Sequence, residues 1–148
     1  MKSQTTDISR NFIHKMTKEE KIAFLKAFTC LANSDGHFDK EEKEFIGEIA
    51  YLYGLDKKAR DEIMKENDAE EVIREVSKIK NRRAELELIK EMCMLAHANG
   101  VFSDEETLFI GRVGKAMGVE PEKVAQISRW VIDRLIWLEE AKLIFEEK

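Results

Sequence analysis

The sequence predicts an all-α fold, a bundle of about seven to eight helices, and three observations support this prediction. Strong helix formers, chiefly Lys, Glu, Leu, Ile and Ala, dominate the 148 residues, which include one Pro and seven Gly. No segment shows the sustained two-residue alternation of a half-buried strand. Two similar segments also recur along the chain, each with apolar residues at helical spacing. We therefore expect a single helical domain over residues 1–148.

The two similar segments are residues 21–63 and 85–127, which align without a gap at a constant offset of 64. Twelve of the 43 aligned positions are identical, and several others, such as Phe24/Leu88, Leu25/Ile89 and Ile49/Val113, pair two apolar residues. Two copies favour repeats related by a pseudo-two-fold axis, because a solenoid needs about three or more units. The identical pairs are Lys26/Lys90, Leu31/Leu95, Ala32/Ala96, Gly36/Gly100, Phe38/Phe102, Glu41/Glu105, Glu42/Glu106, Phe45/Phe109, Ile46/Ile110, Gly47/Gly111, Gly54/Gly118 and Ile63/Ile127.

Repeat one, about residues 17–66, begins with a helix that has clear start and stop signals. Thr17 and Glu20 have the spacing of a capping box, which satisfies backbone N–H groups at a helix start. Gly36 suits the end of the helix, because glycine adopts a left-handed conformation at no steric cost. The apolar stripe of this helix is Phe24, Leu25, Phe28, Leu31 and Ala32.

Two further helices complete repeat one. Asp39 is placed to cap the second helix, with Glu42 at the reciprocal position, and Gly54 is placed to end it. Asp56 is placed to cap a shorter third helix. The residues of the second helix that we expect to face the core are Phe45, Ile46, Ile49 and Leu52.

Repeat two, about residues 82–127, has the same organisation, with Ser103 and Glu106 as its capping box. A connecting helix is predicted between the repeats, at about residues 69–80. The last helix, about residues 121–145, starts at a proline, which suits a first helical position, and continues well past the repeat.

The C-terminal helix carries apolar residues on two faces. Trp130 and Trp137 are seven residues apart on one face, and the other face is formed by Val124, Ile127, Val131, Leu135 and Leu138. A helix that is apolar on two faces is either buried on both or meets a partner. Both alternatives stay open here. In the second, Trp130 and Trp137 would bind a protein partner or form the seam of a homodimer.

The stretch between the first two helices of each repeat invites comparison with a calcium-binding loop. With Gly36 at the bend, Asp35, Asp39 and Glu42 fall at positions that supply oxygen ligands in such a loop. The first ligand position, however, is Leu31. The corresponding stretch of repeat two has lost nearly all its charge, so a working calcium loop of this kind is not expected.

Helix capping accounts for most of these residues, and Asp35, beside the bend, is the exception. If the pseudo-two-fold axis brings both loops together, Asp35, Asp39, Glu42 and Glu106, with Asn99 and Asp104, would share one acidic surface. Such a surface could hold a hard divalent cation, namely calcium, magnesium or manganese.

The doubled unit, LANSDGHFDKEEKEFIGEIAYLYGL and LAHANGVFSDEETLFIGRVGKAMGV, resembles the tellurite-resistance protein B (TerB-like) family over about residues 17–137. The resemblance implies an all-α bundle with internal pseudo-symmetry and a link to tellurite and other stress responses. Related domains are fused to a J-domain co-chaperone. The resemblance also implies a metal site, with Asp35 and Glu42 as first candidates and Glu106 from the second half. Asn99 replaces a common Asp, which argues against two symmetric ions. No enzymatic activity follows from the family.

Composition and motif content exclude several functional classes. The net charge is −5, and the one basic cluster, at residues 78–83, is small, so nucleic-acid binding is not expected. Neither cysteine belongs to a CxxC motif, which favours free thiols in a reducing compartment. The N-terminal residues lack a signal peptide and no apolar run is long enough to cross a membrane, so we expect a cytoplasmic protein.

The sequence therefore predicts a non-enzymatic binding or adaptor module, because no catalytic motif is found. In the first hypothesis the module is TerB-like and acts in stress response through its acidic loop surface and a bound divalent cation. In the alternative it is a metal-free protein–protein interaction or co-chaperone-type module that acts through its C-terminal helix, with a homodimer as one form.

Overall fold

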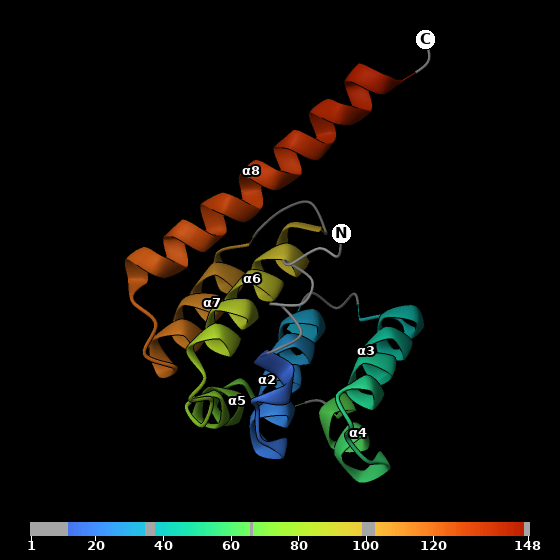
Figure 1. Ribbon diagram of the computed structural model, residues 1–148, viewed down its shortest axis with the longest axis vertical. Coiled ribbons are helices and arrows are strands. Elements are labelled where there is room, and N and C mark those ends of the chain that lie inside the picture. The colour runs from blue at the N-terminus through green and yellow to red at the C-terminus, as the bar shows by residue number, and fades with distance from the viewer. Residues whose placement is uncertain (1–11, 35–37, 66, 99–102, 147–148) are drawn as a thin grey trace.

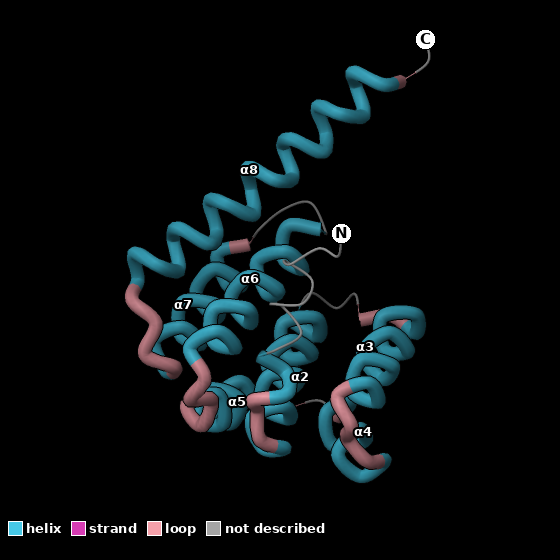
Figure 2. The backbone as a smooth tube through the Cα atoms, in the orientation of Figure 1, coloured by secondary structure: helices cyan, strands magenta, loops and turns pink. Residues whose placement is uncertain are grey.

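In the computed structural model the described residues are 12–34, 38–65, 67–98 and 103–146, and every regular element among them is a helix (Figure 2). This confirms the all-α prediction. A helical turn at 12–14 precedes seven longer helices. They are α2 (Lys18–Ser34), α3 (Lys40–Leu52), α4 (Lys57–Met64), α5 (Ala69–Val76), α6 (Arg82–Ala98), α7 (Asp104–Ala116) and α8 (Pro121–Phe145).

The predicted caps at Asp39 and Asp56 are present, whereas Gly36, predicted to end the first helix, lies outside the described residues. Asp39 and Asp56 each accept a hydrogen bond from the backbone N–H three residues later, at 2.8 and 2.9 Å. Gly54 and Gly118 follow α3 and α7 with φ of 81° and 79°, the left-handed conformation that favours glycine. The helix boundaries of both repeats are therefore set largely by local chemistry.

The capping box at the start of α2 also has a long-range role that its spacing does not indicate. Thr17 and Glu20 exchange the two expected hydrogen bonds, at 2.9 and 3.1 Å. The second carboxylate oxygen of Glu20 accepts a hydrogen bond from the backbone N–H of Lys80 at 2.8 Å. Burial acts to raise the pKa of Glu20, but these backbone N–H groups outweigh it and lower the pKa. This single carboxylate thereby ties the start of α2 to the segment just before α6.

The first helices of the two repeats form the centre of the bundle (Figure 1). Helix α2 packs against α4, α5 and α6, and α6 packs against α2, α7 and α8. The connecting helix α5, which ends at Val76 rather than near residue 80, lies against α2 and α7. The largest fully buried side chains include Leu31, Ile46, Ile63, Leu88, Ile89 and Met92.

Lys26, identical in the two repeats, is buried in repeat one. Its side chain is 3% exposed, and its Nζ donates to Glu62 at 3.0 Å and to Glu75 at 3.1 Å. The ammonium group therefore joins α2 to α4 and α5. The counterpart Lys90 is 26% exposed and pairs with two glutamates of its own helix. The two repeats thus place the same residue in different environments.

The prediction that Phe45 and Leu52 face the core is wrong. Their side chains are 57% and 79% exposed, whereas Ile46 and Ala50 of the same helix are buried. Among the described helices, α3 packs chiefly against α4 and α2, so its buried face is narrower than its apolar stripe.

Helix α8 projects beyond the rest of the bundle (Figure 1). At the repeat offset its first eight residues, 121–128, correspond to α4, and residues 129–145 extend past that correspondence. We call residues 129–145 the α8 extension. Among the helices described, none combines the length and the apolar composition needed to cross a bilayer.

Candidate functional site

The residues predicted to bind a metal lie at the starts of α3 and α7. Asp35 falls outside the described residues. Asp39 is exposed and caps α3, Glu42 is half-buried in the first turn of that helix, and Glu106 is buried in the first turn of α7. Within the described part of the chain, no three His, Cys, Asp or Glu side chains form a group that could hold a metal ion.

Glu106 has an oxygen that capping does not use. Its Oε1 accepts a hydrogen bond from the Ser103 backbone N–H at 3.0 Å, and its own N–H donates to Ser103 Oγ at 3.1 Å. Glu106 is only 4% exposed, and its Oε2 is buried with no hydrogen-bond partner among the described residues. A buried carboxylate oxygen without a partner is costly, so Oε2 is suited to a cation or to a hydrogen-bond donor.

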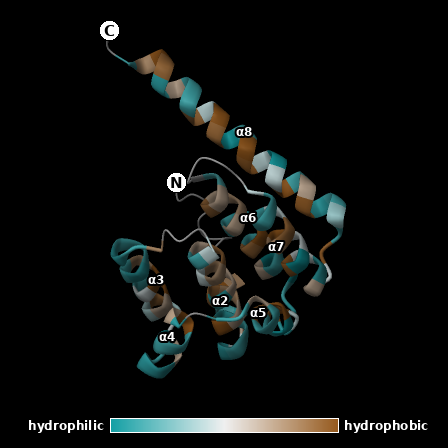
Figure 3. Cartoon of the chain, turned by 180° about the vertical axis from the view of Figure 1, so that it is seen from behind, coloured by the Kyte–Doolittle hydropathy of each residue, from teal (hydrophilic) through white to brown (hydrophobic). Residues whose placement is uncertain are grey.

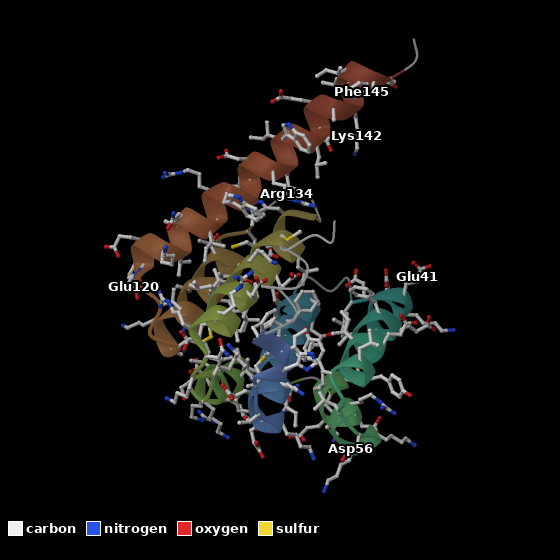
Figure 4. The ribbon with its side chains drawn as sticks, in the orientation of Figure 1. Glu41, Asp56, Glu120, Arg134, Lys142 and Phe145 are labelled. Carbon is white, nitrogen blue, oxygen red and sulfur yellow. The ribbon has the colours of Figure 1, made fainter. Side chains whose placement is uncertain are left out.

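The α8 extension is rich in apolar residues, which Figure 3 colours brown along the projecting end of the helix. Trp130 is 54% exposed, Trp137 69% and Phe145 80%. Phe145 lies at the far end of α8, away from every other helix (Figure 4). The body of the bundle buries Val131 and partly covers Leu135. Of the two alternatives for this helix, the structure therefore excludes burial of the tryptophan face within the described fold.

Two grooves flank the first half of α8 on opposite sides. A smaller one, of about 330 Å³, lies between α6 and α8 and includes Leu86 and Trp130. A larger one, of about 840 Å³, lies between α7 and α8, with Cys93 and Ile110 among the residues that line it. Sequence reasoning missed both grooves, because each depends on how α8 sits against its neighbours.

The two cysteines are free, with Cys93 buried and Cys30 partly buried. Burial raises the pKa of Cys93 to about 11, against a weaker lowering by a hydrogen bond with Ser128. Burial also raises the pKa of Cys30. Both thiols are therefore protonated near neutral pH, the form that does not act as a nucleophile.

The basic cluster is engaged in ion pairs within the fold. Arg82 donates to Glu120 at 2.8 Å, and Arg83 pairs with Glu87 at 2.8 Å. Two of its four cations thus already have carboxylate partners.

A family model described as tellurite resistance protein TerB matches the chain twice, over residues 2–65 and 55–129. The two matches follow the two repeats, and nearly all of the α8 extension lies outside them. No match was found among curated proteins or among solved structures.

Proposed function

Because the chain belongs to the TerB family of tellurite-resistance proteins, we propose that it is a non-enzymatic binding module that holds a divalent cation at the start of α7. The observation that supports this proposal is the buried Oε2 of Glu106, which has no hydrogen-bond partner among the described residues. An oxygen ligand of this kind suits a hard cation, namely calcium, magnesium or manganese.

The other acids near this oxygen give weaker support. Asp104 and Glu105 also lie in the first turn of α7, but both are exposed. Carboxylates at a helix N-terminus interact favourably with the helix dipole, so their presence there needs no cation. Only the buried oxygen of Glu106 requires a partner that these interactions do not supply.

Glu106→Gln should weaken cation binding by at least about tenfold, because it removes the charge from the buried ligand. The amide keeps an oxygen that can accept the Ser103 N–H, so the cap of α7 is retained. Isothermal titration with calcium, magnesium and manganese in turn measures the affinity.

Glu105→Gln is the matched control, because it removes the same charge from an exposed side chain in the same turn. The control should bind as the unaltered chain does. Absence of saturable binding to the unaltered chain, or equal loss in both variants, would assign Glu106 to capping alone.

A second function is favoured by the exposure of Trp130 and Trp137. We propose that a protein partner covers this face of α8 without a metal, as an adaptor or co-chaperone-type module would. Buried tryptophans are common anchors of protein interfaces, whereas a monomer rarely exposes two on one helix face.

A photo-crosslinking residue at position 137 should yield a crosslinked species in cells, and one at position 51 should not. Trp137 and Tyr51 are both 69% exposed, so the comparison is matched for accessibility. The mass of the crosslinked species separates a different protein from a second copy. Equal crosslinking at both positions, or none at 137, would remove the support for this function.

A further inference from the structure

The two repeats differ in how the groove beside their second helix is filled. In repeat one, Met64 of α4 packs beside Gly47 of α3, with its Cε 3.9 Å from the position of a Cβ at that glycine. The counterparts in repeat two are Ser128 and Gly111. No atom of the described residues lies within 4 Å of the Cβ position at Gly111. The groove between α7 and α8 is therefore open where repeat one holds a methionine side chain.

The α7–α8 groove has an apolar floor and cationic edges. Cys93 and Ile110, which are 1% and 2% exposed, line its floor. Lys115 and Arg129 line it as well, and neither forms an ion pair with another described residue. The groove is suited to an apolar side chain that has carboxylates beside it.

The side of α8 that lines this groove carries a stripe of residues that continues along the α8 extension. Successive residues of the stripe are alternately four and three positions apart, which is the pattern by which one helix packs along another. Of its members, Ile132, Ile136 and Leu143 are 38%, 51% and 76% exposed. This groove-side stripe consists of Ala125, Arg129, Ile132, Ile136, Glu139 and Leu143.

The groove-side stripe of one chain is complementary, in shape and charge, to the same stripe of a second chain that runs antiparallel to it. Two antiparallel copies place Ile136 against Ile132 of the other copy, and Leu143 against Ala125. The same register places the one cation of the stripe, Arg129, against its one anion, Glu139. A parallel pair would instead oppose arginine to arginine and glutamate to glutamate, which is repulsive.

We propose that a second copy of this chain docks on this face. The two α8 helices lie antiparallel, and Leu143 of each copy enters the α7–α8 groove of the other, at the place that Met64 fills in repeat one. Glu139 pairs with Lys142 of its own helix at 3.1 Å, but both side chains are at least 70% exposed. Such a surface pair is weak, so Glu139 can exchange it for Arg129 of the second copy.

This interface is distinct from the tryptophan face. Arg129 and Ile132 line the groove against α7, whereas Trp130 lines the groove against α6. Trp137 follows Trp130 by seven residues and lies on the same side of the helix. The dimer therefore does not depend on the cation or on the partner proposed for the tryptophans. A chain that fails to dimerise would not change the interpretation of the cation titration or of the crosslinking at position 137.

Sedimentation velocity of the full chain, from micromolar to millimolar concentration, tests the pairing. The unaltered chain should dimerise, and Arg129→Glu or Glu139→Arg alone should raise the dissociation constant at least about tenfold. The double variant Arg129→Glu with Glu139→Arg should recover most of the affinity. A chain that is monomeric at every concentration, or a double variant that stays dissociated, would overturn the proposal.

Two neighbouring substitutions test which face is used. Ile136→Ser should weaken the dimer, Trp137→Ser should leave it intact, and tryptophan emission should not change on dimerisation. Ser128→Met should also weaken the dimer, because the methionine side chain would fill the part of the α7–α8 groove that Leu143 of the second copy enters. Circular dichroism verifies that each variant keeps its helix content. Dissociation by Trp137→Ser with no effect of Ile136→Ser would place the contact on the opposite face and overturn this assignment.

Discussion

Lys26→Ala should lower the free energy of unfolding by about 3 kcal/mol, because it removes the cation from a buried ion-pair network. Lys26 is 3% exposed, and its Nζ lies 3.0 Å from Glu62 and 3.1 Å from Glu75. Without it, Glu75, which is 19% exposed, stays partly buried with no cation beside it. Urea denaturation followed by circular dichroism measures the loss.

Lys90→Ala is the matched control, since Lys90 occupies the same position in repeat two. Its side chain is 26% exposed and pairs only within α6, so its replacement should cost about 1 kcal/mol or less. Losses of equal size in the two variants would show that the contacts of Lys26 with α4 and α5 add no stability.

The pH dependence of stability gives a second readout of the Lys26 network. A hydrogen bond from Lys26 is the main cause of the lowered pKa of Glu62. A carboxylate with a lowered pKa stabilises the fold above its unfolded pKa, and this contribution is lost as pH falls through its folded value. For Lys26, burial acts to lower the pKa, but hydrogen bonds with Glu62 and Glu75 outweigh it and raise the pKa. The contribution of Lys26 to stability is lost as pH rises through its raised pKa. Lys26→Ala should therefore weaken the pH dependence of stability both at acidic pH, where Glu62 titrates, and at basic pH, where Lys26 titrates.

Local signals in the sequence predicted the helices and their caps well. The boxes at Thr17 and Ser103 and the caps at Asp39 and Asp56 join residues three apart, so spacing alone defines them. Gly54 and Gly118, which adopt the left-handed conformation, are likewise indicated by their positions directly after a helix. Such features depend on the chain within one turn of a helix and not on the packing of the bundle.

Contacts between distant segments could not be predicted in this way. The hydrogen bond from Lys80 to Glu20 joins residues 60 apart. Phe45 has the spacing of a core residue but is exposed, because among the described helices α3 packs chiefly against α4 and α2. The sequence likewise identified two apolar faces on α8, but which of them the bundle covers depends on the direction that α8 takes.

The candidate cation site likewise combines a feature that local spacing predicts with a feature that depends on the fold. Spacing indicated Glu106 as a cap residue, and the structure shows the capping bonds. Its candidacy as a metal ligand came instead from the assumed pseudo-two-fold axis and from the family resemblance. That its second oxygen is buried is a property of the folded chain, and no pattern within one helix could indicate it.

Ile63→Ala should cost about 3 kcal/mol, whereas Ile127→Ala, at the identical position of repeat two, should cost about 1 kcal/mol. Ile63 is 0% exposed, and α4 buries it against α2. Ile127 is only partly buried and borders the open groove between α6 and α8. A cavity forms only where the surroundings enclose the deleted atoms, so the same substitution has unequal costs. Urea denaturation at low protein concentration, where an α8-mediated dimer would not contribute, measures both values. Equal costs would mean that the second repeat encloses its isoleucine as fully as the first, and that the groove beside α8 closes in solution.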